Sequence, residues 1–142
     1  MQKMTGEEYR QFMLAGTRTG KLATVRADGR PHVVPVWFVM DGDVIVFTTW
    51  HTTVKAANIR RDPRVTLCVD DETPPYAFVM VEGTAAFADI TLDDLAQWAT
   101  RIGGRYMGAE QAEAFGRRNG VEGELLVRLT PTKITAIKGM SD

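Results

Sequence analysis

The sequence contains one cysteine and only two histidines, and these scarcities exclude several kinds of protein. A single thiol cannot build a disulfide framework, so we expect a chain that folds in a reducing compartment. Cys68 lies in the apolar run VTLCV with no cation beside it in sequence, which favours a core position over a reactive nucleophile. The histidines, His32 and His51, fall in different segments without ligand spacing, so the sequence predicts no metal site.

Long apolar runs and a strong net charge are also missing. No segment approaches the roughly 18 apolar residues of a membrane-spanning helix, and the first residues carry glutamates where a secretory signal needs an apolar stretch. The formal net charge of −1 provides no general attraction to nucleic acid or to an anionic membrane. We therefore expect a cytoplasmic protein that folds as one domain over residues 1–142 and has no nucleic-acid or membrane partner.

The pattern of apolar residues predicts a mostly β protein. Asp28-Gly29 and Asp41-Gly42-Asp43 are tight-turn sequences, because Asp and Gly tolerate positive φ, so the first three strands are expected to form an antiparallel meander. No glycine-rich turn follows the first strand, which argues against a dinucleotide-binding fold. A closed or half-closed antiparallel barrel is favoured. Its six or seven short strands are predicted at residues 20–26, 32–40, 44–49, 65–69, 76–87, 125–130 and 133–138, with a turn at Pro131-Thr132 between the last two.

Two or three short helices are expected between the strands. Thr5 with Glu8 three residues later has the pattern of a capping box. Thr52 or Thr53 can cap a second helix, which Asp62-Pro63 ends. A third helix begins near Thr91 and is expected to end at Gly103-Gly104, and a further helical pattern covers residues 109–118.

Two positions interrupt the predicted strands. Pro35 cannot donate to a sheet ladder, so the strand at residues 32–40 needs an edge, a bulge or a break there. One interpretation is an ordinary edge strand, and the other is a strand left open so that a ligand can bond to the backbone at Val36 and Trp37. Gly83 within the strand at residues 76–87 predicts a bulge or a close backbone approach.

The segment 43–64 contains the strongest candidate for a binding site. A strand leads into a loop rich in hydroxyl groups and then into a helix that carries Lys55 in its first turn. A cation there opposes the helix dipole, and a bound anion would reverse that cost. Free N–H groups, hydroxyls and a lysine together can bind a phosphate. The alternative is a capped surface helix with a solvated lysine, and the cluster of Arg60, Arg61 and Arg64 is likewise either a solvated helix end or an anion-attracting rim.

No nucleophile elbow and no evident acid or base is present, so a cofactor is expected to supply the chemistry. A phosphate site beside an open strand suits a flavin-like ligand. Its phosphate would bind at Lys55 and the threonines, and its ring would lie along the backbone at residues 35–37.

Five segments, in this order and spacing, resemble a known family. These segments resemble the pyridoxamine 5′-phosphate oxidase-like split β-barrels, and most closely the flavin/deazaflavin oxidoreductases of the B subgroup, which use coenzyme F420. The resemblance covers residues 20–85, with a weaker echo at 125–137. The segments are GKLATV at 20–25, DGRPH at 28–32, PVWF at 35–38, KAANIRRDPRV at 55–65 and VEGTA at 81–85.

The resemblance implies a fold and a set of site residues. The implied fold is a six- to seven-stranded antiparallel split β-barrel of the FMN-binding type, forming a homodimer with the cofactor at the interface. Some relatives have arginine in place of Thr53, which weakens the implied grip on the phosphate. The implied cofactor-binding residues are Lys55, Thr48, Thr49 and Thr53 at the phosphate, the backbone of Pro35, Val36 and Trp37 along the ring, and Tyr76 reaching in from the other subunit.

The implied activity is that of an F420-dependent reductase. Such an enzyme transfers a hydride between coenzyme F420 and a small organic acceptor such as a quinone, an enone or a tetrapyrrole. Two alternatives stay open on the resemblance. One is an FMN-dependent oxidase or reductase of the pyridoxamine phosphate oxidase type, and the other is a non-enzymatic protein that binds or carries flavin, F420 or haem.

Overall fold

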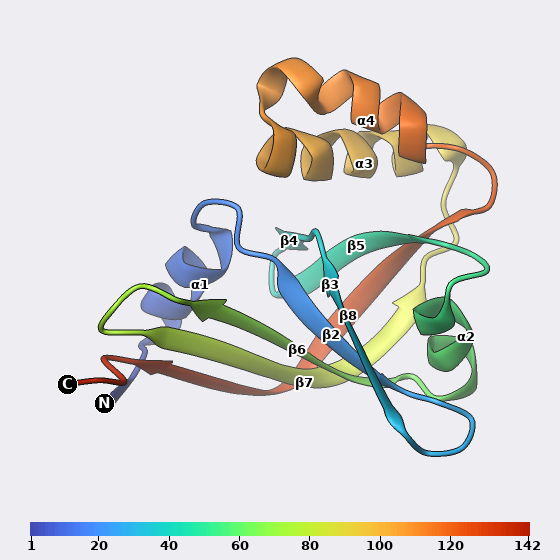
Figure 1. The fold of residues 1–142 in the computed structure, drawn as a ribbon. Helices are drawn as coiled ribbons and strands as arrows, with labels where there is room; N and C mark the ends of the chain where they lie inside the picture. The colour runs from blue at the N-terminus through green and yellow to red at the C-terminus, as the bar shows by residue number, and fades with distance from the viewer.

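The computed structural model describes residues 1–142 and is dominated by one antiparallel sheet that curls into a barrel, as Figure 1 shows. The mostly β prediction is confirmed. The strands are β1 (Gln2–Lys3), β2 (Gly20–Val25), β3 (Pro31–Val36), β4 (Val39–Asp41), β5 (Val44–Trp50), β6 (Arg64–Asp71), β7 (Ala77–Phe87) and β8 (Glu124–Lys138). The helices are α1 (Gly6–Leu14), α2 (Val54–Arg61), α3 (Leu92–Met107) and α4 (Ala112–Asn119), with a short 3₁₀ turn at Ala109–Gln111.

The order of strands in the sheet explains where the barrel is open. Along the sheet the order is β3-β2-β6-β7-β8-β5-β4, with β1 pairing separately with β8. β3 and β4 are neighbours in the chain, yet they occupy the two ends of this path. The sheet therefore curves round until its two ends meet at the connection Trp37–Phe38, which is the split of the barrel.

The predicted continuous strand at residues 32–40 is wrong, and so is the three-stranded meander built on it. β3 pairs only with β2, and β4 pairs only with β5. The physical reason lies at Phe38, whose backbone bonds to a helix instead of a strand. Its N–H donates to the Tyr106 hydroxyl at 3.2 Å, and its carbonyl accepts from Arg105 at 2.7 Å. Pro35 thus lies on an edge strand that ends one residue later. Of the edge, bulge or break expected at this proline, the edge and the break both occur.

β8 is one strand of 15 residues, so the turn predicted at Pro131-Thr132 is wrong. Pro131 pairs with Gly83, at the point where the register between β7 and β8 shifts. A side chain at Gly83 would bring its Cβ to 2.3 Å from the Thr130 carbonyl oxygen, so only glycine fits. The bulge predicted at Gly83 is confirmed, and it is this irregularity that accommodates a proline, which has no N–H for the ladder.

The core has two parts. Seventeen buried residues fill the barrel, and α1 closes one end of it with Tyr9 and Met13. A smaller cluster attaches α3 to the outside of β4, β5 and β8. The smaller cluster consists of Val39, Val46, Leu95, Ile102 and Leu126.

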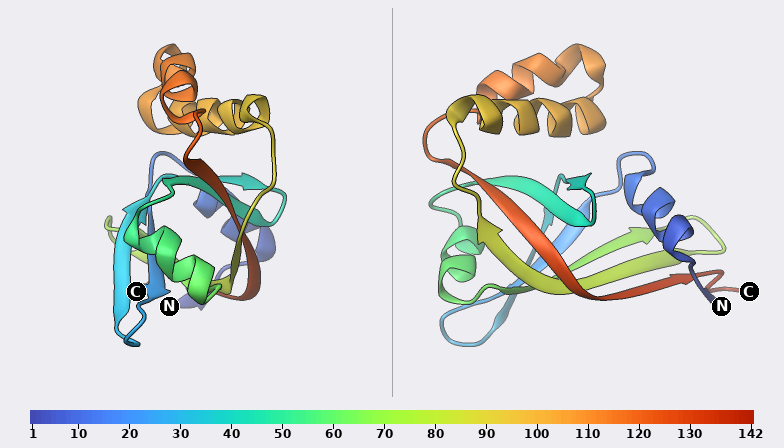
Figure 2. Two further views of the ribbon diagram at one scale, coloured as in Figure 1. Left: turned by 90° about the vertical axis from the view of Figure 1, so that its right-hand side faces the viewer. Right: turned by 180° about the vertical axis from the view of Figure 1, so that it is seen from behind.

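Four α-helices form, each where the sequence shows a helical pattern, although two or three were expected in total. The Thr5–Glu8 capping box and the Thr53 cap are both present. α3 continues past the predicted stop at Gly103-Gly104, because Gly103 is a packing residue: a Cβ there would lie 2.4 Å from Cβ of Phe115 on α4. α3 and α4 lie side by side as a helical pair outside the barrel (Figure 2). None of the helices has the length and apolarity needed to cross a bilayer.

Candidate functional site

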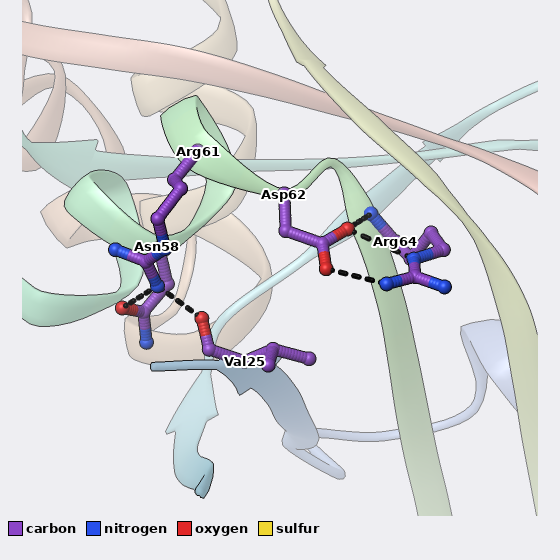
Figure 3. Close-up of polar contacts among 5 residues, drawn as sticks. All are labelled: Val25, Asn58, Arg61, Asp62 and Arg64. Atoms are coloured by element: carbon purple, nitrogen blue, oxygen red, sulfur yellow. Dashed lines mark hydrogen bonds and ion pairs between the residues drawn. The ribbon is translucent and has the colours of Figure 1, made fainter. Parts of the chain in front are cut away.

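Two polar side chains of α2, Asn58 and Arg61, bond to the barrel and hold the helix against it (Figure 3). We call these two residues the clamp. Asn58, which is buried, donates from Nδ2 to the hydroxyl of Thr24 on β2 at 2.9 Å. Arg61 donates to Oδ1 of Asn58 at 3.0 Å and also to the carbonyl of Val25. Side chains one turn apart on α2 therefore hold it to β2, and the first turn of the helix is kept in a defined place.

The arginines after the clamp have partners within the protein. Arg64 bonds to both carboxylate oxygens of Asp62, which holds the pKa of that carboxyl at about 2. Arg60 donates to the His51 carbonyl at 3.0 Å. These contacts explain the arginine-rich segment as a helix end and turn, and they favour that interpretation over an anion-attracting rim.

Two threonines order the loop that precedes α2. The Thr53 hydroxyl caps the helix by accepting from the N–H of Ala56 at 3.3 Å, and it donates to the Trp50 carbonyl at 2.9 Å. Thr49 is buried, and its hydroxyl lies 2.8 Å from that of Thr53. Because the only proton of the Thr53 hydroxyl is already given to Trp50, Thr49 must be the donor in this pair. Both hydroxyl protons are thus used to shape the loop.

A cavity of about 280 Å³ lies at the split of the barrel, where the two ends of the sheet meet. It gathers residues from β3, β5, α2, α3, the end of α4 and the start of β8. Five of the eight cofactor-binding residues predicted from the sequence line it together: Pro35, Val36, Trp37, Thr48 and Lys55. The other lining residues are Ile102, Asn119 and Glu124. A larger open groove of about 490 Å³ on β2, β6 and β7 contains none of the eight.

The cavity is lined by one cation and one anion. Burial lowers the pKa of the Lys55 ammonium, and nearby Glu124 opposes that shift. Burial raises the pKa of the Glu124 carboxyl, and the Thr48 hydroxyl, Lys55 and Arg118 oppose it. The ammonium of Lys55 takes part in none of the side-chain hydrogen bonds or ion pairs of the structure. The protein therefore holds a half-buried positive charge without a partner of its own.

Glu124 is the functional candidate that sequence reasoning missed. Glu122, two positions earlier in the turn that precedes β8, is an exposed residue of the same type. The difference arises because Glu124 begins β8 opposite Trp50, which brings it beside the loop that leads to α2. That pairing is between residues far apart in sequence, and no local signal marks it.

Trp37 is the aromatic residue that lines the cavity, and two further aromatic rings pack against it. The Trp37 ring stacks on Tyr106 of α3, with ring centroids 5.2 Å apart and planes only 3° from parallel. Phe115 of α4 lies against the same ring at 5.6 Å. The Tyr106 hydroxyl donates to the Arg18 carbonyl at 2.9 Å, so the ring that stacks on Trp37 is bonded to the barrel. Trp37 remains 36% exposed, which leaves part of its ring open to a ligand.

Tyr76, the eighth predicted site residue, lies elsewhere. It precedes β7 in the β6–β7 connection, at the end of the sheet opposite α2 (Figures 1 and 2). It is exposed and has a positive φ of 61°, which its N–H contact to Thr73 supports. Its own chain does not bring it to the cavity, so a role there requires a second copy.

Residues 5–138 match the sequence model of a family described as pyridoxamine 5′-phosphate oxidase. Among solved structures, the fold is similar to that of the conserved hypothetical protein Rv2991 from Mycobacterium tuberculosis. The TM-score is 0.83 at 26% identity, over 97% of this chain and 87% of that one.

Two further solved structures share the fold. One is named F420 reductase, with 30% identity, a TM-score of 0.67, and coverage of 87% of this chain and 94% of that one. The other is HutZ, named as the haem storage protein from Vibrio cholerae, with 22% identity, a TM-score of 0.71, and coverage of 96% and 95%. Since an F420 reductase and a haem storage protein share this barrel, the fold alone does not select the ligand.

Proposed function

The chain belongs to the pyridoxamine 5′-phosphate oxidase family, and from this premise we propose that it is an oxidoreductase that uses coenzyme F420. The proposed reaction is hydride transfer between the deazaflavin and a small organic acceptor such as a quinone, an enone or a tetrapyrrole. One observation carries the proposal: the unpartnered ammonium of Lys55 lies in a cavity that also contains the end of an edge strand. The 30% identity to a protein named F420 reductase supports the choice of cofactor.

Each part of the cavity has a role in this proposal. Lys55 and Thr48 bind the cofactor phosphate, and Thr49 and Thr53 fix the helix N-terminus that faces it. β3 pairs on one side only, so its other edge offers backbone N–H and C=O groups to the ring near Val36. When bound, the deazaflavin supplies the hydride chemistry, and the protein binds, orients and shields it.

Cofactor binding and turnover test the proposal in two steps. Purified protein should be colourless and should bind F420 in a fluorescence titration. Reduced F420 should then be oxidised when a quinone or enone acceptor is added. Tight binding of FMN without binding of F420 would replace the proposal with an FMN-dependent oxidase or reductase. Binding of F420, flavin or haem with no turnover on any acceptor would make the protein a carrier.

We also propose that the active form is a homodimer. The cavity of about 280 Å³ is at the lower limit of ligand pockets, which run from roughly 300 to 1,000 Å³. A single chain therefore encloses only part of a deazaflavin. A second copy would enlarge the site and could contribute Tyr76, which is exposed on its own chain. Light scattering at micromolar concentration with cofactor present should report a dimer, and a monomer would contradict an interface site.

A further inference from the structure

The charge balance of the cavity indicates which kind of phosphate it accepts. Lys55 is the one cation that lines it, and Glu124 is the one anion. The two do not pair, because neither takes part in any of the eight ion pairs of the structure. A phosphate that binds Lys55 in so small a space also lies near the Glu124 carboxylate. Charges that face one another across such a partly buried cavity are screened by salt much less than charges on the open surface.

We propose that Glu124 is a specificity-determining residue that makes the site favour a phosphodiester, which carries one negative charge, over a phosphomonoester, which carries two. This inference rests on the proposed function, because it assumes that the cofactor phosphate binds at Lys55. Coulomb repulsion is proportional to the product of the charges, so Glu124 opposes a dianion about twice as strongly as a monoanion. F420 carries a phosphodiester and FMN carries a phosphomonoester, so the residue would select between the two cofactors left open by the fold.

The surroundings of Glu124 act on its charge in both directions. Burial raises the pKa of the carboxyl, and the Thr48 hydroxyl, Lys55 of α2 and Arg118 of α4 oppose that shift by favouring the ionised form. His51, in the loop before α2, lies against the turn that precedes it, since its ring is next to Gly123. Lowering the pH should therefore neutralise Glu124 and weaken the discrimination.

The test measures the affinities of F420 and FMN for the wild type and for Glu124→Gln at pH 8, where the monoester is a dianion. The substitution keeps the shape and removes the charge. If F420 binds more tightly by some factor, FMN should gain by about the square of that factor, so that a threefold gain for F420 accompanies about a tenfold gain for FMN. The control is Glu122→Gln, which makes the same change of net charge at an exposed position outside the cavity and should alter neither affinity.

Each other outcome has a defined meaning. Equal gains, no gain, weaker binding of both cofactors, or FMN excluded from both proteins would overturn the proposal. If F420 does not bind but Glu124→Gln admits FMN, the charge selection stands and the F420 assignment fails. Should the variant not fold by circular dichroism, Glu124→Ala replaces it in the same comparison at pH 8, where the charge of the FMN phosphate is fixed. Equal changes in the affinities of F420 and FMN in Glu124→Ala would contradict the proposal.

Discussion

Lys55 is the residue whose energetics differ most between a binding site and an ordinary helix start. Burial lowers the pKa of its ammonium, and its place in the first turn of α2 sets a cation against the positive end of the helix dipole. Its charge therefore costs stability in the free protein, and this cost is offset when an anion binds.

Lys55→Ala should weaken cofactor binding and leave the fold intact. Loss of a charge-assisted hydrogen bond of ~1.5–3 kcal/mol corresponds to a rise in Kd of roughly tenfold to 150-fold. Without cofactor the variant should melt no lower than the wild type, and most of the thermal shift that cofactor confers should disappear. The exposed Lys133→Ala on β8 is the control and should behave as wild type. An unchanged binding titration for Lys55→Ala would contradict the proposal that the cofactor phosphate binds at Lys55.

Glu124 should make the stability of the free protein depend on pH. Because burial raises the pKa of its carboxyl above 4.5, the folded protein binds this proton more tightly than the unfolded chain does. The stability of the wild type therefore falls as the pH rises from the ordinary carboxyl value through the raised one. Glu124→Gln avoids that loss, so it should melt a few degrees higher than wild type at pH 8 and about equally near pH 4. A higher melting temperature for wild type at pH 8 would contradict the expected sign, and Glu122→Gln should show no such difference.

At the scale of the element, α2 depends on its clamp. A helix of eight residues is not stable alone in water, so its position comes from contacts with the barrel. Asn58→Ala removes the bonds to Thr24 and Arg61 and should destabilise the protein by about 1–3 kcal/mol in denaturant unfolding. Cofactor affinity should fall as well, although Asn58 does not line the cavity. Gln97→Ala, at an exposed position of α3, should change neither quantity, and an unaltered affinity for Asn58→Ala would show that α2 keeps its place without the clamp.

The bulge between β7 and β8 is the second element whose sequence is restricted. Gly83→Ala places a Cβ against the Thr130 carbonyl and should cost about 1–3 kcal/mol through overpacking. Gly6→Ala in the first turn of α1 is a matched control, because nothing lies within 4 Å of the added carbon. Equal unfolding midpoints for the two variants would mean that the strands separate easily at this point.

Features of single elements were predictable where their causes are local. The Thr5 capping box, the turn at Asp28-Gly29 and the Thr53 cap each depend on residues within a few positions of one another. The continuation of α3 past Gly103 was not predictable, because Gly103 packs against Phe115, which lies on another helix. A glycine pair that packs and one that ends a helix look the same in the sequence.

At the scale of the whole molecule, the fold class was predictable, whereas the number and order of the strands were not, since eight strands form where six or seven were expected. The break after Val36 is stabilised by Arg105 and Tyr106, which lie more than 60 positions further along the chain. Glu124 reaches the cavity through its pairing with Trp50, a residue that is also far from it in the sequence. Five of the predicted site residues nevertheless meet in one cavity, since the segment 35–55 brings them together through one strand break and one hairpin.

The outer surface of β3 offers a test of the proposed dimer. Val33 is 64% exposed in the single chain, on the edge strand whose end forms the cavity. Val33→Glu should place a charge at the interface, shift the protein to a monomer in light scattering, and weaken cofactor binding while circular dichroism stays unchanged. The control is Val54→Glu on α2, which adds the same charge at another exposed position and should leave the oligomeric state unchanged. A dimer that persists in Val33→Glu would place the interface on another surface.

The helical pair α3–α4 leaves the sheet and returns to it at one point. Phe87 and Val127 are paired in the ladder, and the next N–H, that of Ala88, donates to the Leu126 carbonyl at 2.9 Å. Everything between these residues is an insertion within a β-hairpin, and it supplies the aromatic rings that cover Trp37. Evolution or an engineer can therefore exchange this one segment as a cassette. A new segment that keeps Arg105 and Tyr106, which bond to the Phe38 backbone at the split of the barrel, would cover Trp37 with different side chains while Lys55 and the contacts that hold α2 stay as they are.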